Sequence, residues 1–190
     1  MIALPEAFIL ILGIITPTTS LSAFLSMTKD SNDREKHSIA IKAVVVAAVV
    51  FLIFLLGGDV ILGALGVTLN SFRAAGGIVL LLLGIQMTLG ISLGKEKKET
   101  KETGIAVVIG TPFITGPATI TTTIILTKEL GMIPTFLAGA SALFVTFLVL
   151  FFSNYINRLI GREGIQMLST MMGIITMAWG IQFLLGGLAA

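Results

Sequence analysis

Long apolar runs, separated by short polar links, make up most of this chain. The six runs lie at about 4–27, 39–60, 70–92, 104–127, 132–155 and 166–187. Each is close to the roughly 20 residues that a helix needs to cross a bilayer, and hydrocarbon admits only helices and closed barrels as spanning structures. Because the runs lack the apolar–polar alternation of barrel strands, we expect an all-α integral membrane protein with six transmembrane helices.

The composition agrees with this class and excludes several functions. The chain is 55% hydrophobic and 12% charged, whereas soluble domains are about 45–50% apolar and about 25% charged. It has no cysteine, which excludes disulfides, thiol catalysis and cysteine-bound metals. Its single histidine, His37, lies in a polar link, so we expect no catalytic site, metal site or cofactor in the membrane. The start of the chain lacks a basic segment, and we interpret the first run as a retained span.

The basic residues predict the orientation. Ten fall on one side of the expected spans, namely Lys29, Arg34, Lys36, Lys42, Lys95, Lys97, Lys98, Lys101, Arg158 and Arg162. Only Arg73 and Lys128 fall on the other. Since basic loops remain in the cytoplasm, we expect a multi-pass protein of the cell membrane with cytoplasmic charged links and both termini outside. Acidic residues are mixed into these links, so nucleic acid is not an expected partner.

Two of the runs contain prolines among hydroxyl residues. They read TPTTSLSAF at 16–24 and TPFITGPATITTT at 111–123. Proline has no amide hydrogen and clashes with the carbonyl group four residues earlier, so a helix breaks there. Backbone groups left unpaired in hydrocarbon are costly unless they line a cavity, and transporters bind substrates at such broken helices near the midplane. We therefore expect spans 1 and 4 to be broken and to hold a binding site.

The position of the two breaks predicts an internal duplication. Breaks in the first and fourth spans divide the chain into three-helix repeats at 1–94 and 104–190, joined by a charged cytoplasmic connector at 95–103. An odd number of spans makes the second repeat inverted. The pairs Gly77-Ile78 and Gly84-Ile85 also recur 96 positions later, as Gly173-Ile174 and Gly180-Ile181.

The helix that begins after each break is a candidate anion site. Its free amides carry partial positive charge and can hold a carboxylate, while nearby hydroxyl and carbonyl oxygens can accept from an ammonium group. The predicted substrate-binding residues are Thr16, Pro17, Thr18, Thr19, Ser20, Thr115, Gly116, Pro117, Ala118, Thr119 and Thr122. Alternatively, these hydroxyls bond only to carbonyls of their own helix and ease the kinks.

Three further polar residues are candidates for the pocket or for a gate. Gln86 and Gln182 either face the pocket or form buried hydrogen bonds between helices. Arg73 either pairs with Asp59 or Asn70 as a gate, or anchors its span at the membrane interface.

Three segments resemble the MarC family of six-span membrane proteins, also called the small neutral amino acid transporter family. They are TPTTSLSAFLSMT at 16–28, SFRAAGGIVLLLLGIQM at 71–87 and TPFITGPATITTTIIL at 111–126. The resemblance covers essentially the whole chain, although Thr16 stands where many members carry an acid. It implies transport of glycine- or alanine-like amino acids across the cell membrane, coupled to a proton or sodium gradient.

Two other functions stay open from the sequence. A passive channel for small polar solutes also uses half-helices that meet at a constriction. A structural subunit without transport of its own is the third reading. The expected partners are a small neutral amino acid and the lipid bilayer, and the chain is compatible with a homo-oligomer.

Overall fold

The computed structural model describes residues 4–28, 31–89 and 102–189, and these residues are almost entirely helical. The first half contains α1 (Leu4–Ile15), α2 (Pro17–Met27), α3 (Asp33–Ala64) and α4 (Leu69–Leu89). The second half contains α5 (Glu102–Val108), the π-helix η1 (Ile109–Ile114), α6 (Pro117–Leu130), α7 (Met132–Phe151) and α8 (Ser153–Leu188). Most of the predicted connector at 95–103 lies outside the described residues.

The expected all-α membrane protein is confirmed, with five segments long and apolar enough to span a bilayer among the described residues. These are Leu4–Leu25, Asp33–Ala64, Leu69–Leu89, Met132–Phe151 and Glu163–Leu188. The run expected at 104–127 is not one continuous helix, because it is divided among α5, η1 and α6. It therefore does not qualify as a span by helix length.

The first predicted break lies between α1 and α2. Pro17 is the first residue of α2, where its missing amide hydrogen costs nothing. A residue that precedes proline is disfavoured in the α-helical region, and Thr16 adopts a left-handed conformation with φ 44° and ψ 73°. The chain thus leaves α1 and re-enters a helix within one residue.

The second break is longer. Before it, η1 contains Pro112, and the amide of Thr115 donates to the carbonyl of Gly110 at 3.0 Å, which is the wide spacing of a π-helix. Gly116 is extended, with φ −78° and ψ 177°, and Pro117 then begins α6. The two prolines spread this interruption over about two helical turns.

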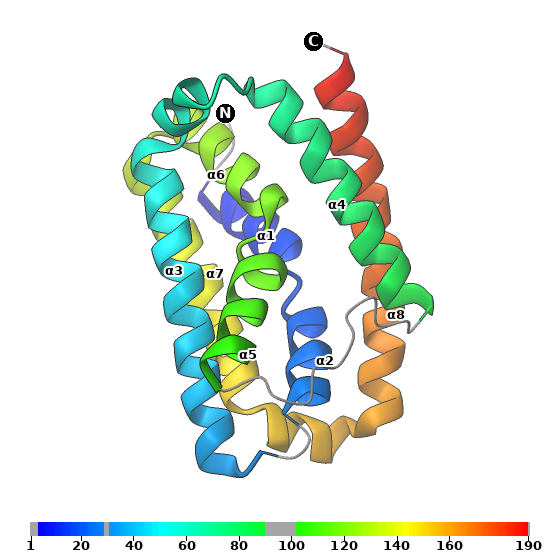
Figure 1. Ribbon diagram of the computed structural model, residues 1–190. Coiled ribbons are helices and arrows are strands. Elements are labelled where there is room, and N and C mark those ends of the chain that lie inside the picture. The colour runs from blue at the N-terminus through cyan, green and yellow to red at the C-terminus, as the bar shows by residue number, and fades with distance from the viewer. Residues whose placement is uncertain (1–3, 29–30, 90–101, 190) are drawn as a thin grey trace.

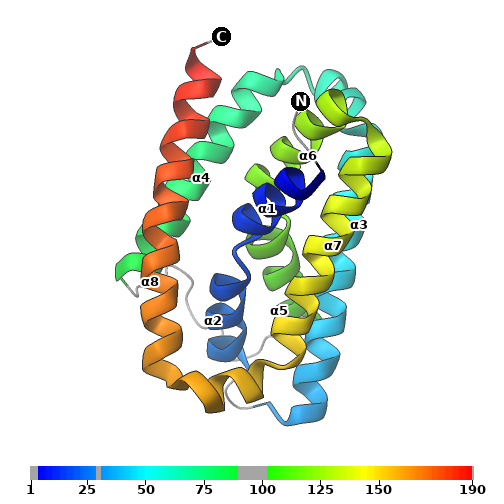
Figure 2. The same cartoon turned by 180° about the vertical axis from the view of Figure 1, so that it is seen from behind.

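The broken helices lie between two helix pairs (Figures 1 and 2). On one side are α3 and α7, and on the other are α4 and α8, with α1, α2, α5 and α6 in the middle. The largest buried apolar cluster joins α1 and α2 to α3, α5, η1 and α7, and includes Ile11, Ala43, Ile109 and Ala142. The beginning of α1 and the end of α8 lie at the same end of the molecule.

Helices α4 and α8 pack in close backbone contact, and glycine makes this approach possible. A Cβ atom at Gly77 would lie 2.5 Å from the amide nitrogen of Leu184, and one at Gly180 would lie 2.8 Å from that of Leu81. Small residues allow such contacts between membrane helices, where van der Waals packing is the main attraction. Gly77 and Gly180 thus serve the packing of these two helices.

Candidate functional site

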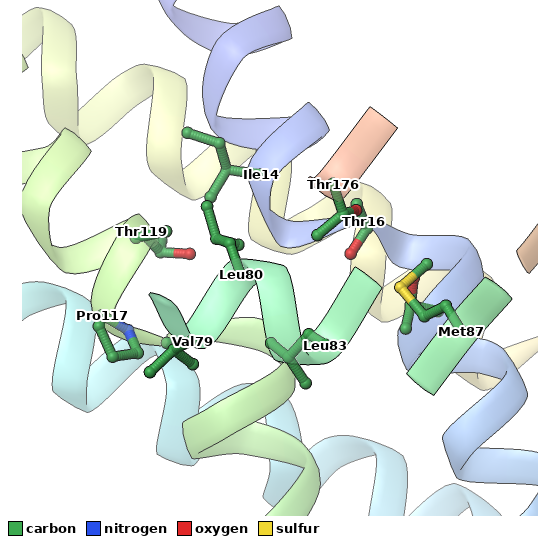
Figure 3. Close-up of a pocket in the computed structure, with 12 residues that line it drawn as sticks. Ile14, Thr16, Val79, Leu80, Leu83, Met87, Pro117, Thr119 and Thr176 are labelled. Carbon is green, nitrogen blue, oxygen red and sulfur yellow. The ribbon is translucent and has the colours of Figure 1, made fainter. Parts of the chain in front are cut away.

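A small cavity lies where the two broken helices meet α4 and α8 (Figure 3). Its volume is about 20 Å³. It is lined by Ile14, Thr16, Thr19, Val79, Leu80, Leu83, Met87, Gly116, Pro117, Ala118, Thr119 and Thr176. Both predicted breaks therefore contribute to one cavity.

The first break contributes Thr16 and Thr19. The carbonyl oxygen of Thr16 accepts from the amides of Thr19 at 3.0 Å and Ser20 at 3.2 Å, which closes the first turn of α2. The Thr19 hydroxyl donates to the sulfur of Met87 at 3.3 Å, a weak acceptor. A ligand in the cavity that offers a better acceptor can take the hydrogen bond of the Thr19 hydroxyl away from Met87, and the hydroxyl then stays paired.

The second break contributes Gly116, Pro117, Ala118 and Thr119. The Thr119 hydroxyl donates to the carbonyl oxygen of Ile114 at 3.1 Å, across the break. Gly76 of α4 lies against the start of α6, since a Cβ there would be 3.5 Å from the amide nitrogen of Ala118. The glycine at position 76 thus allows the α4 backbone to approach this helix start closely.

The electrostatic character of the cavity comes from helix ends. The starts of α2 and α6 both lie at it, and each helix N-terminus carries partial positive charge. No charged side chain is found among the described residues that line the cavity. The cavity can therefore stabilise a negative group while remaining free of formal charge.

Several predicted site residues lie near the breaks but outside the cavity lining. Thr115 is buried, and its hydroxyl donates to the carbonyl oxygen of Ala47 on α3 at 3.0 Å. The hydroxyl oxygens of Thr18, Ser20 and Thr122 are buried without a hydrogen-bond partner in the described structure. Thr115 thus holds the second break against α3. The hydroxyls of Thr18, Ser20 and Thr122 have unused hydrogen-bonding capacity.

The alternative interpretation, in which hydroxyls bond within their own helix, applies to Thr121 and Thr123 of α6. Thr121 donates to the carbonyl of Pro117 at 2.8 Å, and Thr123 donates to that of Thr119 at 2.7 Å. Such bonds satisfy a buried hydroxyl locally. These two threonines are structural rather than candidate ligands.

The glutamines and Arg73 do not line this cavity. Gln182 was expected to be buried, but it lies on the exposed face of α8, and Gln86 is half-buried on α4. The Arg73 guanidinium lies over the ring of Phe183, 5.4 Å from its centroid. Asp59, one predicted partner of Arg73, instead pairs with Lys128 at 3.0 Å.

The sequence interpretation missed the wall that α4 and α8 provide. Leu80, Leu83 and Met87 of α4 close the cavity opposite the breaks, and Thr176 of α8 lies beside Thr16 in Figure 3. Among these residues, only Thr176 could have been recognised from the sequence, because it is a hydroxyl residue that lies between Gly173 and Gly180. The aliphatic residues are indistinguishable by type from those that face lipid.

Comparison with known proteins gives the family. The family model described as MarC family integral membrane protein matches residues 1–190. A UPF0056 membrane protein of Aquifex aeolicus (strain VF5) is 31% identical over 96% of this chain and 91% of its own. A UPF0056 membrane protein of Methanocaldococcus jannaschii is 32% identical, covering 96% and 94% of the two chains.

A third relative is the UPF0056 inner membrane protein YhgN of Escherichia coli (strain K12), which is 28% identical over 96% of this chain and 94% of its own. No solved structure matches the chain. The match to the family model over the whole chain, together with these relatives, shows that this protein belongs to the MarC family of integral membrane proteins.

Proposed function

We propose that the protein is a secondary transporter that moves small neutral amino acids, such as glycine and alanine, across the cell membrane. The observation that carries the proposal is the convergence of two helix starts, at Pro17 and Pro117, on one uncharged cavity. A substrate carboxylate is stabilised at these helix starts. The hydroxyls of Thr16, Thr19 and Thr119 surround the same space and can bond to either end of a zwitterion.

The size of the cavity indicates a closed state. Its 20 Å³ holds about one water molecule and is too small for an amino acid. Binding therefore requires the apolar wall of Leu80, Leu83 and Met87 to withdraw from the breaks. In our proposal α4 and α8, joined by glycine contacts, move as one body against the core shared by α1, α3 and α7.

We also propose six spans in two inverted three-helix repeats, with α5, η1 and α6 together forming the fourth span. The contacts between α4 and α8 support this. Gly77 contacts Gly180 and Leu184, and Gly173 contacts Gly84 and Thr88. Positions 77, 84 and 88 of the first repeat correspond to positions 173, 180 and 184 of the second, each 96 residues later. The contacts of Gly173 are therefore those of Gly77 with the two repeats exchanged. A two-fold axis produces such reciprocal contacts.

The orientation and the coupling ion complete the proposal. Both termini face outside and the basic links face the cytoplasm, as the distribution of lysine and arginine predicts. A proton or sodium gradient drives transport. Hydroxyl and carbonyl oxygens are suitable ligands for a sodium ion. Ser20 and Thr122 have buried hydroxyls near the breaks that find no partner among the described residues.

The test is transport by the purified protein in proteoliposomes. We expect saturable uptake of labelled alanine that an imposed proton or sodium gradient stimulates. We also expect counterflow, in which unlabelled alanine inside the vesicles drives transient accumulation of label. A passive channel gives flux without counterflow, and that outcome would replace the carrier. No alanine flux with folded protein would reject this substrate class.

A further inference from the structure

A second, larger pocket opens at the opposite end of α6 from the central cavity. Its volume is about 130 Å³, and its lining includes Gly57, Asp59, Thr127, Lys128 and Met132. This volume is several times the roughly 10–15 Å³ that one water molecule requires, so a molecule of a few heavy atoms fits. The pocket lies between the C-terminal parts of α3 and α6.

Among the described residues that line the pocket, one side chain is positive and one is negative, and they neutralise each other. The Lys128 ammonium lies 3.0 Å from a carboxylate oxygen of Asp59. Their side chains are 51% and 56% exposed, so the pair is hydrated and opens readily. A zwitterion that enters between them exchanges one ion pair for two, because its carboxylate meets Lys128 and its ammonium meets Asp59.

The inner end of the pocket is closed. Gly58 of α3 lies so close to Ile124 of α6 that a Cβ there would be 2.5 Å from a side-chain carbon of Ile124. Ile124 also packs in a buried cluster with Leu62 and Ile120. A ligand at the ion pair is therefore separated from the central cavity, and Lys128 is roughly 14 Å along α6 from Thr119.

The α3 wall of this pocket is irregular. Gly57 has non-helical backbone angles, φ −137° and ψ 15°, and kinks α3 two residues before Asp59. Among the described residues a Cβ at Gly57 would meet only the far end of Ile61, at 3.8 Å, so there is open space beside the kink.

We infer that Asp59 and Lys128 form a second binding site, which captures the zwitterionic backbone of an amino acid at the end of the molecule where α1 begins and α8 ends. This inference rests on the proposed function for its substrate class. The site recognises the ammonium and carboxylate groups together, whereas the central cavity selects a small side chain. Amines and carboxylic acids that carry only one of the two charges bind it weakly.

The absence of cysteine allows a direct test by thiol labelling. The reporter is Met132→Cys, whose native side chain is exposed and lines the pocket. The matched control is Ile133→Cys, which is exposed but outside the pocket lining. Both variants are placed in lipid nanodiscs, where both faces are accessible, and the rate of reaction with a water-soluble maleimide is measured with and without alanine.

We expect alanine to slow labelling of Met132→Cys in a saturable way and to leave Ile133→Cys unchanged. Propionate and ethylamine should protect weakly. Protection should be lost when Lys128→Gln or Asp59→Asn is added, and retained with Glu129→Gln, whose acid is exposed but outside the pocket lining. It should also be retained with Thr119→Val, which alters only the central cavity.

Four outcomes would overturn the inference. One is that alanine fails to protect Met132→Cys although the same protein transports alanine when it is reconstituted in vesicles. That result would leave the proposed function intact. Another is protection that survives both Lys128→Gln and Asp59→Asn. The third is protection lost with Thr119→Val, which would assign the effect to the central cavity. Absence of both protection and alanine transport would reject the second site and the proposed function together.

Discussion

Gly84 of α4 and Gly173 of α8 face each other so closely that neither position has room for a Cβ atom. A Cβ at Gly84 would lie 2.7 Å from the carbonyl oxygen of Gly173, and one at Gly173 would lie 2.9 Å from the carbonyl oxygen of Gly84. The contact is reciprocal, and the obstacles at both positions include backbone atoms, which cannot rotate away. The two helices are therefore held as one body by a seam of glycines.

Alanine in this seam should destabilise the protein. Gly84→Ala forces the α4 and α8 backbones apart, and overpacking of this kind costs about 1–3 kcal/mol. The control is Gly63→Ala on α3, where a Cβ would meet open space and better helix propensity gains up to about 1 kcal/mol. Thermal unfolding of the purified proteins in detergent should move in opposite directions for the two variants. Equal midpoints would contradict the close packing.

Thr16→Gly should stabilise the protein and weaken transport. A β-branched residue at φ 44° is strained by about 1–2 kcal/mol, and glycine relieves this strain. Glycine also makes the break more flexible, so the start of α2 is less fixed against the cavity. The control is Ala75→Gly, at an exposed position inside α4, where glycine costs about 0.5–1 kcal/mol relative to alanine. If both variants lose stability equally, Thr16 is not a strained residue.

The single tryptophan should report substrate binding. Trp179 of α8 packs directly on Gly13 of α1 and belongs to the apolar cluster of Ile14, Leu80 and Ala118 beside the cavity. If α4 and α8 withdraw when alanine binds, the environment of the indole changes. Its fluorescence should then shift saturably with alanine, and Trp179→Phe should remove the signal. Unchanged emission at concentrations that saturate uptake would argue against this movement.

The helix breaks could be predicted because their cause is local. Pro17 and Pro117 each interrupt hydrogen bonding within one turn, and the structure begins helices at both. The π-helix before Thr115 was not anticipated. Pro112, five residues before Pro117, lies within this π-helix, and its missing amide hydrogen removes one bond that a regular α-helix would make there.

The face that each membrane helix turns toward the cavity could not be predicted. Hydropathy indicates which residues lie in the bilayer, but lipid and protein interior are both apolar. Leu80 and Leu82 therefore look alike in sequence, although the first lines the cavity and the second is exposed. Gln182 shows the converse, a polar residue in an apolar run that the structure places on an exposed face.

Uptake of labelled alanine by threonine-to-valine variants tests the central claim most directly. Thr19→Val and Thr119→Val keep side-chain shape but remove hydroxyls at the two breaks. The matched control is Thr146→Val, a buried threonine whose hydroxyl bonds only to its own helix in the described structure, at the carbonyl of Ala142.

A hydrogen bond contributes about 0.5–1.5 kcal/mol, so each cavity variant should raise KM up to about tenfold. The control should transport like the unaltered protein. Substrate bound between the two helix starts predicts impairment by both Thr19→Val and Thr119→Val. Transport in both variants equal to that of Thr146→Val would contradict this account.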